Sequence, residues 1–202
     1  KKTGENQSLL TVRLSSGAQL TCTPYHKFIL SDGTRVLAEE LETGAKLLKH
    51  EWPVLRDGES FKYPYTHGVF CGDGTYQRQT SGNEYPKVSL YGDKIHLAPH
   101  MDIRTTSGEL DSSGRLNVQL PVDISRKFTV PMGACLTDRL LWLAGLSDTD
   151  GTVSRNDGCE SIQIANTELD FLMRVRLMLT TMGVDAKVTL KREDGTQFMP
   201  DH

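Results

Sequence analysis

The chain has 202 residues, a formal net charge of −3 and hydrophobic residues at 37% of its positions, enough to bury one or two cores. No apolar run approaches the about 20 residues of a membrane span and no signal pattern is present, which favours a soluble, cytoplasmic, intracellular protein without a membrane partner. The cysteines Cys22, Cys71, Cys135 and Cys159 are scattered without a Cys-x-x-Cys pair, so we expect free thiols and no zinc site.

The first fifty residues have the pattern of short β-strands joined by tight turns. Residues 10–14 and 18–22 alternate in hydropathy on either side of Ser15-Ser-Gly17, which predicts a β-hairpin. The segment Thr23-Pro-Tyr-His26 follows, and a Ser-Asp-Gly turn at 31–33 separates two further apolar segments. This region is therefore predicted to be β-rich.

Residues 65–76 read Tyr-Thr-His-Gly-Val-Phe-Cys-Gly-Asp-Gly-Thr-Tyr, which predicts a helix that ends at Asp73. Residues 85–90 and 116–120 then alternate like strands. Residues 93–101 begin like a helix and are interrupted by a proline.

Residues 141–153 repeat this design, because Leu-Trp-Leu-Ala-Gly-Leu-Ser-Asp-Thr-Asp-Gly-Thr-Val again ends an apolar helix in Asp-Gly, at Asp150. A strand is predicted at 161–165. An amphipathic helix with Thr167 as its N-cap follows, and a last strand is predicted at 186–190.

The two copies share a glycine in the middle of the helix and an acid at its end. Gly68 and Gly145 each cost about 1 kcal/mol relative to alanine unless a second backbone must come close. Asp73 and Asp150 stand directly before glycines that can end a helix in a left-handed turn. A carboxylate is disfavoured at that end of the helix dipole, and a divalent cation would offset the repulsion. If the helices pack through the two glycines, both acids reach the same end of one interface.

This pair of segments resembles the two motifs of a LAGLIDADG homing endonuclease. The second copy, LAGLSDTDG, departs from the family string at Ser147 and Thr149, and the first, THGVFCGDG, keeps the glycine, the apolar pair and the final Asp-Gly. The resemblance implies an α/β (α+β) fold with two pseudo-twofold-related halves of the ααββ type. It also implies Mg²⁺-dependent cleavage of both strands of double-stranded DNA, with Asp73 and Asp150 as catalytic, metal-binding acids, one for each strand.

A lysine between the copies is a further candidate for the catalytic centre. Residues 126–131, Arg-Lys-Phe-Thr-Val-Pro, resemble the Lys-x-x-(Ile/Val)-Pro segment of intein endonucleases. By that resemblance Lys127 would stabilise negative charge on the phosphate or polarise the attacking water. An ordinary solvated lysine before a loop is the alternative.

Residues 10–48 resemble the Hint fold of inteins, in which a Thr-x-x-His segment lies beside the first scissile peptide bond. The resemblance implies that His26 donates a proton to the amide nitrogen during the acyl shift, while Thr23 helps to hold the strained amide. A simple turn is the alternative. The chain starts Lys1-Lys-Thr-Gly and stops at His202, so neither splice junction is present. We therefore expect a fragment that needs the remaining intein segments and acts on flanking exteins.

The sequence thus predicts a monomer with a partial Hint module at 1–60 and an endonuclease domain at 61–202, its halves at about 61–130 and 131–202. The main objection to DNA binding is that the second region holds more acidic than basic residues. Basic residues remain on the predicted strand segments: Arg78, Lys87, Lys94, Arg104, Arg115, Arg155, Lys187, Lys191 and Arg192. Two alternatives stay open, a decayed endonuclease that acts only as a scaffold for splicing and a DNA-binding regulator on the same fold.

Overall fold

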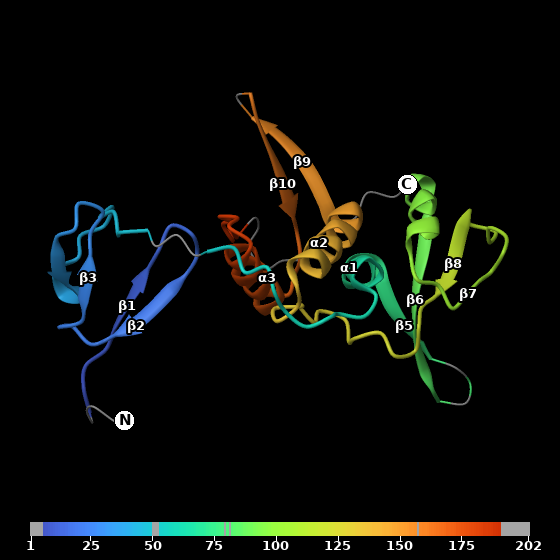
Figure 1. The fold of residues 1–202 in the computed structure, drawn as a ribbon, viewed down its shortest axis with the longest axis horizontal. Helices are drawn as coiled ribbons and strands as arrows, with labels where there is room; N and C mark the ends of the chain where they lie inside the picture. The colour runs from blue at the N-terminus through green and yellow to red at the C-terminus, as the bar shows by residue number, and fades with distance from the viewer. Residues whose placement is uncertain (1–5, 50–52, 79, 81, 157, 191–202) are drawn as a thin grey trace. The chain divides into compact units, whose positions relative to one another are not determined.

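The computed structural model describes residues 6–49, 53–78, 80, 82–156 and 158–190 (Figure 1). The chain forms two compact units, Lys1–Trp52 together with Gly183–His202, and Pro53–Met182. In the described part of the chain, none of the helices combines the length and the apolar character that a membrane crossing requires.

The first unit is built from short antiparallel strands. Its regular elements are β1 (Leu10–Arg13), β2 (Gln19–Cys22), β3 (Lys27–Ile29), β4 (Arg35–Leu37) and the 3-10 turn η1 (Ala38–Glu40). β1 pairs with β2, and Gly17 turns the hairpin with a φ of 85°. β3 pairs with β4 across a turn in which Gly33 has a φ of 87°. The predicted hairpin and the second turn are confirmed.

The strand predicted at 186–190 is wrong. These residues have no regular strand assignment, and one backbone hydrogen bond of this segment runs from the Val188 amide to the Ser16 carbonyl oxygen at 3.3 Å. Ala186 and Val188 are only partly buried, and the Leu190 side chain is 83% exposed, so the segment does not have one buried face. Alternation specifies a strand only when one face is buried.

The second unit centres on two adjacent helices, α1 (Pro64–Asp73) and α2 (Leu136–Asp150), with a third helix, α3 (Leu169–Thr181), against α2 (Figure 1). Trp142 and Leu146 of α2 are fully buried with Met178 of α3 in one core. The N-cap of α3 is Glu168 and not the predicted Thr167, and the Glu168 amide donates a hydrogen bond to the Asn166 side-chain oxygen at 2.9 Å.

A four-stranded antiparallel sheet covers the other side of α1. Its order is β5 (Gly74–Arg78), β6 (Glu84–Tyr91), β8 (Arg115–Gln119) and β7 (Thr105–Thr106). Val88, Leu90 and Val118 are fully buried in a second core with Val69 and Phe70 of α1. The alternation of the sequence thus buries one face of the sheet and leaves polar side chains on the other. The predicted strands at 85–90 and 116–120 are confirmed.

The helix-like stretch that the sequence predicts from residue 93 is a 3-10 segment, η2 (Gly92–His100), which contains Pro99. Proline removes a backbone donor and disfavours a regular α-helix at this point. The segment follows β6, and its Lys94 side chain reaches Asp73 at the end of α1, at the site described below.

After Asp150 the chain forms a two-stranded hairpin, β9 (Gly151–Asn156) and β10 (Cys159–Ile164), which extends away from the helices in Figure 1. Within the described residues no third strand joins it. The elements that follow the two acids therefore start alike, with a hairpin, and then differ. The two pseudo-twofold halves stay a prediction.

Candidate active site at the paired helix ends

α1 and α2 touch through the two glycines that the sequence singled out. A Cβ on Gly68 would overlap the Trp142 carbonyl oxygen and lie 2.8 Å from the Leu146 amide nitrogen. A Cβ on Gly145 would overlap the Tyr65 carbonyl oxygen. Each position therefore excludes a side chain, and the predicted contact of the two backbones is confirmed.

Both helices end at their acid, but the glycines that follow are not in the left-handed conformation. Gly74 has φ −77° and ψ 157°, and Gly151 has φ −80° and ψ 141°, both extended. Glycine is required at both positions by the lack of space. A Cβ on Gly74 would overlap the Phe70 carbonyl oxygen, and a Cβ on Gly151 would overlap the Ser147 carbonyl oxygen, each in the last helical turn. The prediction of left-handed glycines is wrong, and strands β5 and β9 instead leave directly from the acids.

The two carboxylates face a common region. A Cβ on Gly72, the residue before Asp73, would lie 3.2 Å from the Asp150 carboxyl carbon. Burial raises the pKa of Asp150, and the negative charge of Asp73 raises it further. Lys94, Lys127 and a hydrogen bond from Asn166 act in the opposite direction. The two carboxylates therefore concentrate negative charge, which favours the binding of a cation.

Lys94, which the sequence singled out only within the group of basic residues, joins the two helix ends. The Lys94 ammonium donates hydrogen bonds to Asp73 Oδ2 at 2.6 Å and to the Thr149 carbonyl oxygen at 3.0 Å. The Lys94 and Asp73 side chains are only 26% and 21% exposed. This ion pair bridges the last turn of α1 and the last turn of α2.

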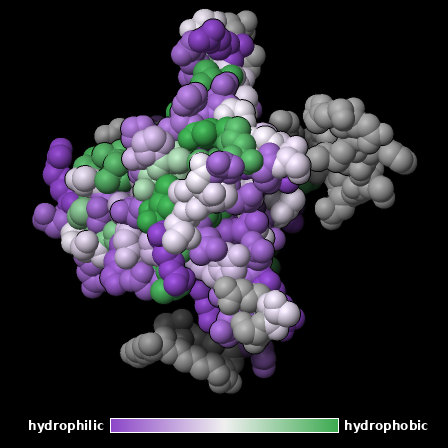
Figure 2. All heavy atoms as spheres, turned by 90° about the vertical axis from the view of Figure 1, so that its right-hand side faces the viewer, coloured by the Kyte–Doolittle hydropathy of each residue, from purple (hydrophilic) through white to green (hydrophobic). Residues whose placement is uncertain are grey.

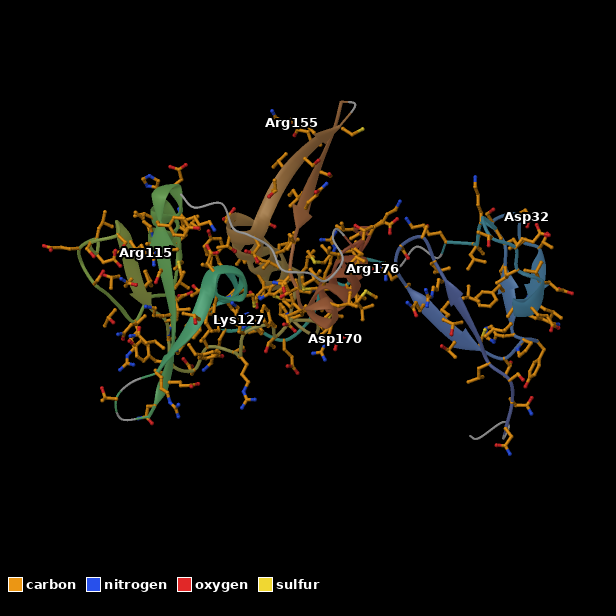
Figure 3. The ribbon with its side chains drawn as sticks, turned by 180° about the vertical axis from the view of Figure 1, so that it is seen from behind. Asp32, Arg115, Lys127, Arg155, Asp170 and Arg176 are labelled. Carbon is orange, nitrogen blue, oxygen red and sulfur yellow. The ribbon has the colours of Figure 1, made fainter. Side chains whose placement is uncertain are left out.

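The structure also brings Lys127 to the acid end of α1 (Figure 3). Its ammonium donates to the Gly74 carbonyl oxygen at 2.6 Å and to the Gly72 carbonyl oxygen at 3.3 Å, on either side of Asp73. Its backbone amide donates to the Tyr76 hydroxyl at 3.2 Å. Lys127 is thus half-buried and anchored. Its catalytic role stays a prediction.

A buried hydrogen-bond chain holds the Lys127 segment. The Trp142 indole donates to His67 Nδ1 at 2.8 Å, so His67 Nε2 carries the proton and donates to the Arg126 carbonyl oxygen at 3.0 Å. Burial lowers the pKa of His67, which favours this neutral form. Since Arg126 precedes Lys127, the chain fixes the backbone from which the lysine reaches α1.

Thr23 and His26 lie in one turn of the first unit. The His26 amide donates to the Thr23 carbonyl oxygen at 3.0 Å, and the His26 ring packs edge-on against Phe28 with centroids 5.3 Å apart. The His26 side chain is exposed. The turn brings the two residues together, and their role in splicing stays a prediction.

The oxygen atoms at the helix ends are suitable ligands for a hard divalent cation. Among the described residues no cluster of three or more His, Cys, Asp or Glu side chains could hold a metal ion. Two carboxylates and the carbonyl oxygen of Thr149 are nevertheless oxygen ligands of the kind that Mg²⁺ binds while it keeps several waters. A positive charge, the Lys94 ammonium, already contacts two of these oxygen ligands, Asp73 Oδ2 and the Thr149 carbonyl oxygen. No disulfide joins the four cysteines, all of which lie in the described residues.

A comparison with known families gives a match in the C-terminal third of the chain. Residues 138–200 match the LAGLIDADG-like domain, and the match contains α2, Asp150 and α3. Residues 138–200, less than half of the chain, are thus similar to a domain of the homing endonuclease family, which is a family of nucleases. The first acid helix lies outside this match.

The similar curated proteins are large subunits of ribonucleotide reductases. The chain is 44% identical over 219 residues to the ribonucleoside-diphosphate reductase large subunit of Invertebrate iridescent virus 6, across 99% of this chain and 22% of that protein. It is 24% identical over 245 residues to the NrdEB subunit alpha of Bacillus subtilis strain 168 and to that of Bacillus phage SPbeta. The chain spans 22% of the length of each of these relatives. No solved structure matches.

Proposed function

We propose that this chain is an intein fragment whose second unit cuts double-stranded DNA at a specific site by Mg²⁺-dependent hydrolysis. The observation that carries the proposal is the meeting of Asp73 and Asp150 at the ends of two helices in contact through Gly68 and Gly145. The LAGLIDADG-like domain at 138–200 supports it independently.

In this proposal Asp73 and Asp150 hold the metal, one acid serving each DNA strand. Bound Mg²⁺ would supply Lewis-acid activation of the phosphate and of the attacking water. Lys127, anchored on the carbonyl oxygens of Gly72 and Gly74, would place a positive charge beside the phosphate at the α1 end. The neutral His67 would act as a positioning residue for this lysine.

The polar face of the sheet is the proposed DNA surface. The side of the molecule that carries β7 and β8 is largely hydrophilic, with apolar side chains between (Figure 2). Exposed basic residues on the strands include Arg78 on β5. Arg115 on β8 and Arg155 on β9 are also exposed (Figure 3). A two-stranded β-ribbon fits the major groove of B-DNA, where each base pair presents a distinct pattern. These arginines would supply positive charge for contacts to DNA, although Arg155 also pairs with Glu160 at 2.8 Å.

The relatives suggest the source of the target. The chain matches 22% of the length of ribonucleotide reductase large subunits almost over its own full length, which supports an element inserted into such proteins. The proposed target is then the coding sequence of a reductase large subunit without the insertion. The proposed Hint part at 1–60, with Thr23 and His26, would work with the remaining intein segments on the flanking exteins.

A DNA cleavage assay tests the nuclease proposal. Plasmid carrying the uninterrupted reductase sequence is incubated with Mg²⁺ or with EDTA, using the wild type, Asp73→Asn and Asp150→Asn. The matched control is Asp148→Asn, since this exposed carboxylate lies on the same helix and bonds the Tyr65 hydroxyl. Metal-dependent linear product that the control keeps and either site variant loses supports the proposal. Intact DNA at enzyme excess contradicts it.

The acidic balance of residues 63–202 favours one second candidate, a scaffold that holds the splicing segments together and no longer cuts DNA. That function requires neither acid. Trans-splicing that survives in the Asp73→Asn and Asp150→Asn variants, together with intact DNA in the cleavage assay, would establish the scaffold in place of the nuclease.

A further inference from the structure

Lys94 occupies an unusual place in the second unit. It lies on η2, and its ammonium contacts a carboxylate of one helix end and a backbone carbonyl of the other, Asp73 Oδ2 at 2.6 Å and Thr149 O at 3.0 Å. Thr149 directly precedes the second acid, Asp150. Lys127 differs, because its contacts at this site are the carbonyl oxygens on either side of Asp73.

The contacts of Lys94 are those that a bound cation would make. The last carbonyl groups of a helix lack partners within the helix and attract positive charge, and Thr149 O belongs to the last turn of α2. Asp73 supplies a carboxylate oxygen and faces the like charge of Asp150. An ammonium is a compact charge with three donors, so it can join such ligands. It thereby reduces the repulsion between the acids.

The Lys94–Asp73 pair is sheltered enough for this contact to matter. The two side chains are 26% and 21% exposed, against 69% and 47% in the surface pair Lys62–Asp123. Exposed pairs contribute little, because water and salt screen them, whereas partly buried pairs are screened less. In the same position the Lys94 ammonium also lies 5.7 Å from the centroid of the exposed Tyr91 ring.

We propose that in the metal-free protein the Lys94 ammonium takes the place of a divalent cation between the ends of α1 and α2, and that a metal ion binds there by displacing it. The inference rests on the proposed function, because it assumes a metal at Asp73 and Asp150. Lys94 then keeps the two acid ends together without metal and makes metal binding an exchange of one cation for another. The exchange lowers the metal affinity of the site and couples metal binding to a movement of Lys94 on η2.

Metal titration of a charge-removing variant tests this proposal without any nuclease assay. Lys94→Met is compared with the wild type and with Lys62→Met, a control that removes the same charge and an ion pair at the surface. Isothermal titration with Mn²⁺ should give an affinity about tenfold higher for Lys94→Met than for the other two proteins, which corresponds to about 1.4 kcal/mol. In EDTA, Lys94→Met should melt below Lys62→Met, and Mn²⁺ should raise its melting temperature more.

The outcomes separate the two proposals. Equal or weaker Mn²⁺ binding by Lys94→Met, beside clear binding by the wild type, overturns the displacement and leaves the proposed nuclease intact. Absence of Mn²⁺ binding in all three proteins overturns the displacement and the proposed metal site together. If Lys94→Met does not fold by circular dichroism, Lys94→Gln replaces it, with a smaller gain in affinity expected because the amide keeps a donor without the charge.

Discussion

Replacing Gly145 with alanine should push α1 and α2 apart. The added methyl would overlap the Tyr65 carbonyl oxygen and lie 3.0 Å from the Val69 amide nitrogen, both in the backbone of α1, which cannot rotate away. Relief requires the helices to separate by on the order of 1 Å, a gap that forfeits a quarter to a half of each van der Waals contact along the seam. Overpacking of this kind costs about 1–3 kcal/mol or more, against at most about 1 kcal/mol regained from helix propensity.

The expected net loss is about 2 kcal/mol, which lowers the melting temperature of the second unit by roughly 8 °C. Thermal and urea unfolding, followed by circular dichroism, measure this loss. Gly133→Ala is the matched control, because a Cβ there meets nothing within 4 Å and the residue has no positive φ. A Gly145→Ala protein as stable as the control would refute the direct contact of the helix backbones.

The remaining predictions concern charge. Burial lowers the pKa of His67 below the ordinary value near 6.5. The stability that its neutral form contributes is therefore fully present above about pH 6.5. It is lost as the pH falls toward the folded-state pKa, by at most about 1.4 kcal/mol per pH unit. Urea midpoints at pH 7.5 and 5.5 should show this loss, and His67→Gln should diminish it. At pH 7 in EDTA, Asp150→Asn should melt above the wild type, because it removes a half-buried charge that faces Asp73, and a lower melting temperature would contradict that repulsion. Lys127→Met should reduce DNA cleavage about 10²-fold or more while Mn²⁺ affinity changes little, and unchanged cleavage would exclude its proposed role.

The contact of the helices could be predicted from the sequence because it depends on backbone alone. A glycine that recurs at the same place in two copies, Gly68 and Gly145, has one simple physical reason, the close approach of a second helix. The strands β6 and β8 were predictable for a similar reason, because one buried face imposes alternation. The positions of the two acids could then be predicted as well, because each acid lies the same number of residues after its glycine.

The errors arose where the surroundings decide the structure. Asp-Gly is compatible with a left-handed or an extended glycine, and the extended form at Gly74 and Gly151 depends on how β5 and β9 leave the helices. Lys94 had no sequence signal of its own, because its position depends on the path of η2 after β6. The alternation at 186–190 could not specify a strand without a face to bury.

The most direct measurement is strand-specific cleavage of a duplex that carries the proposed reductase target, with each strand labelled at one end. With Mg²⁺ the wild type should cut both strands, EDTA should abolish both cuts, and Asp73→Asn and Asp150→Asn should each lose double-strand cleavage. Both cuts retained in the Asp73→Asn/Asp150→Asn double variant would contradict the claim that the acids at the paired helix ends form the catalytic centre.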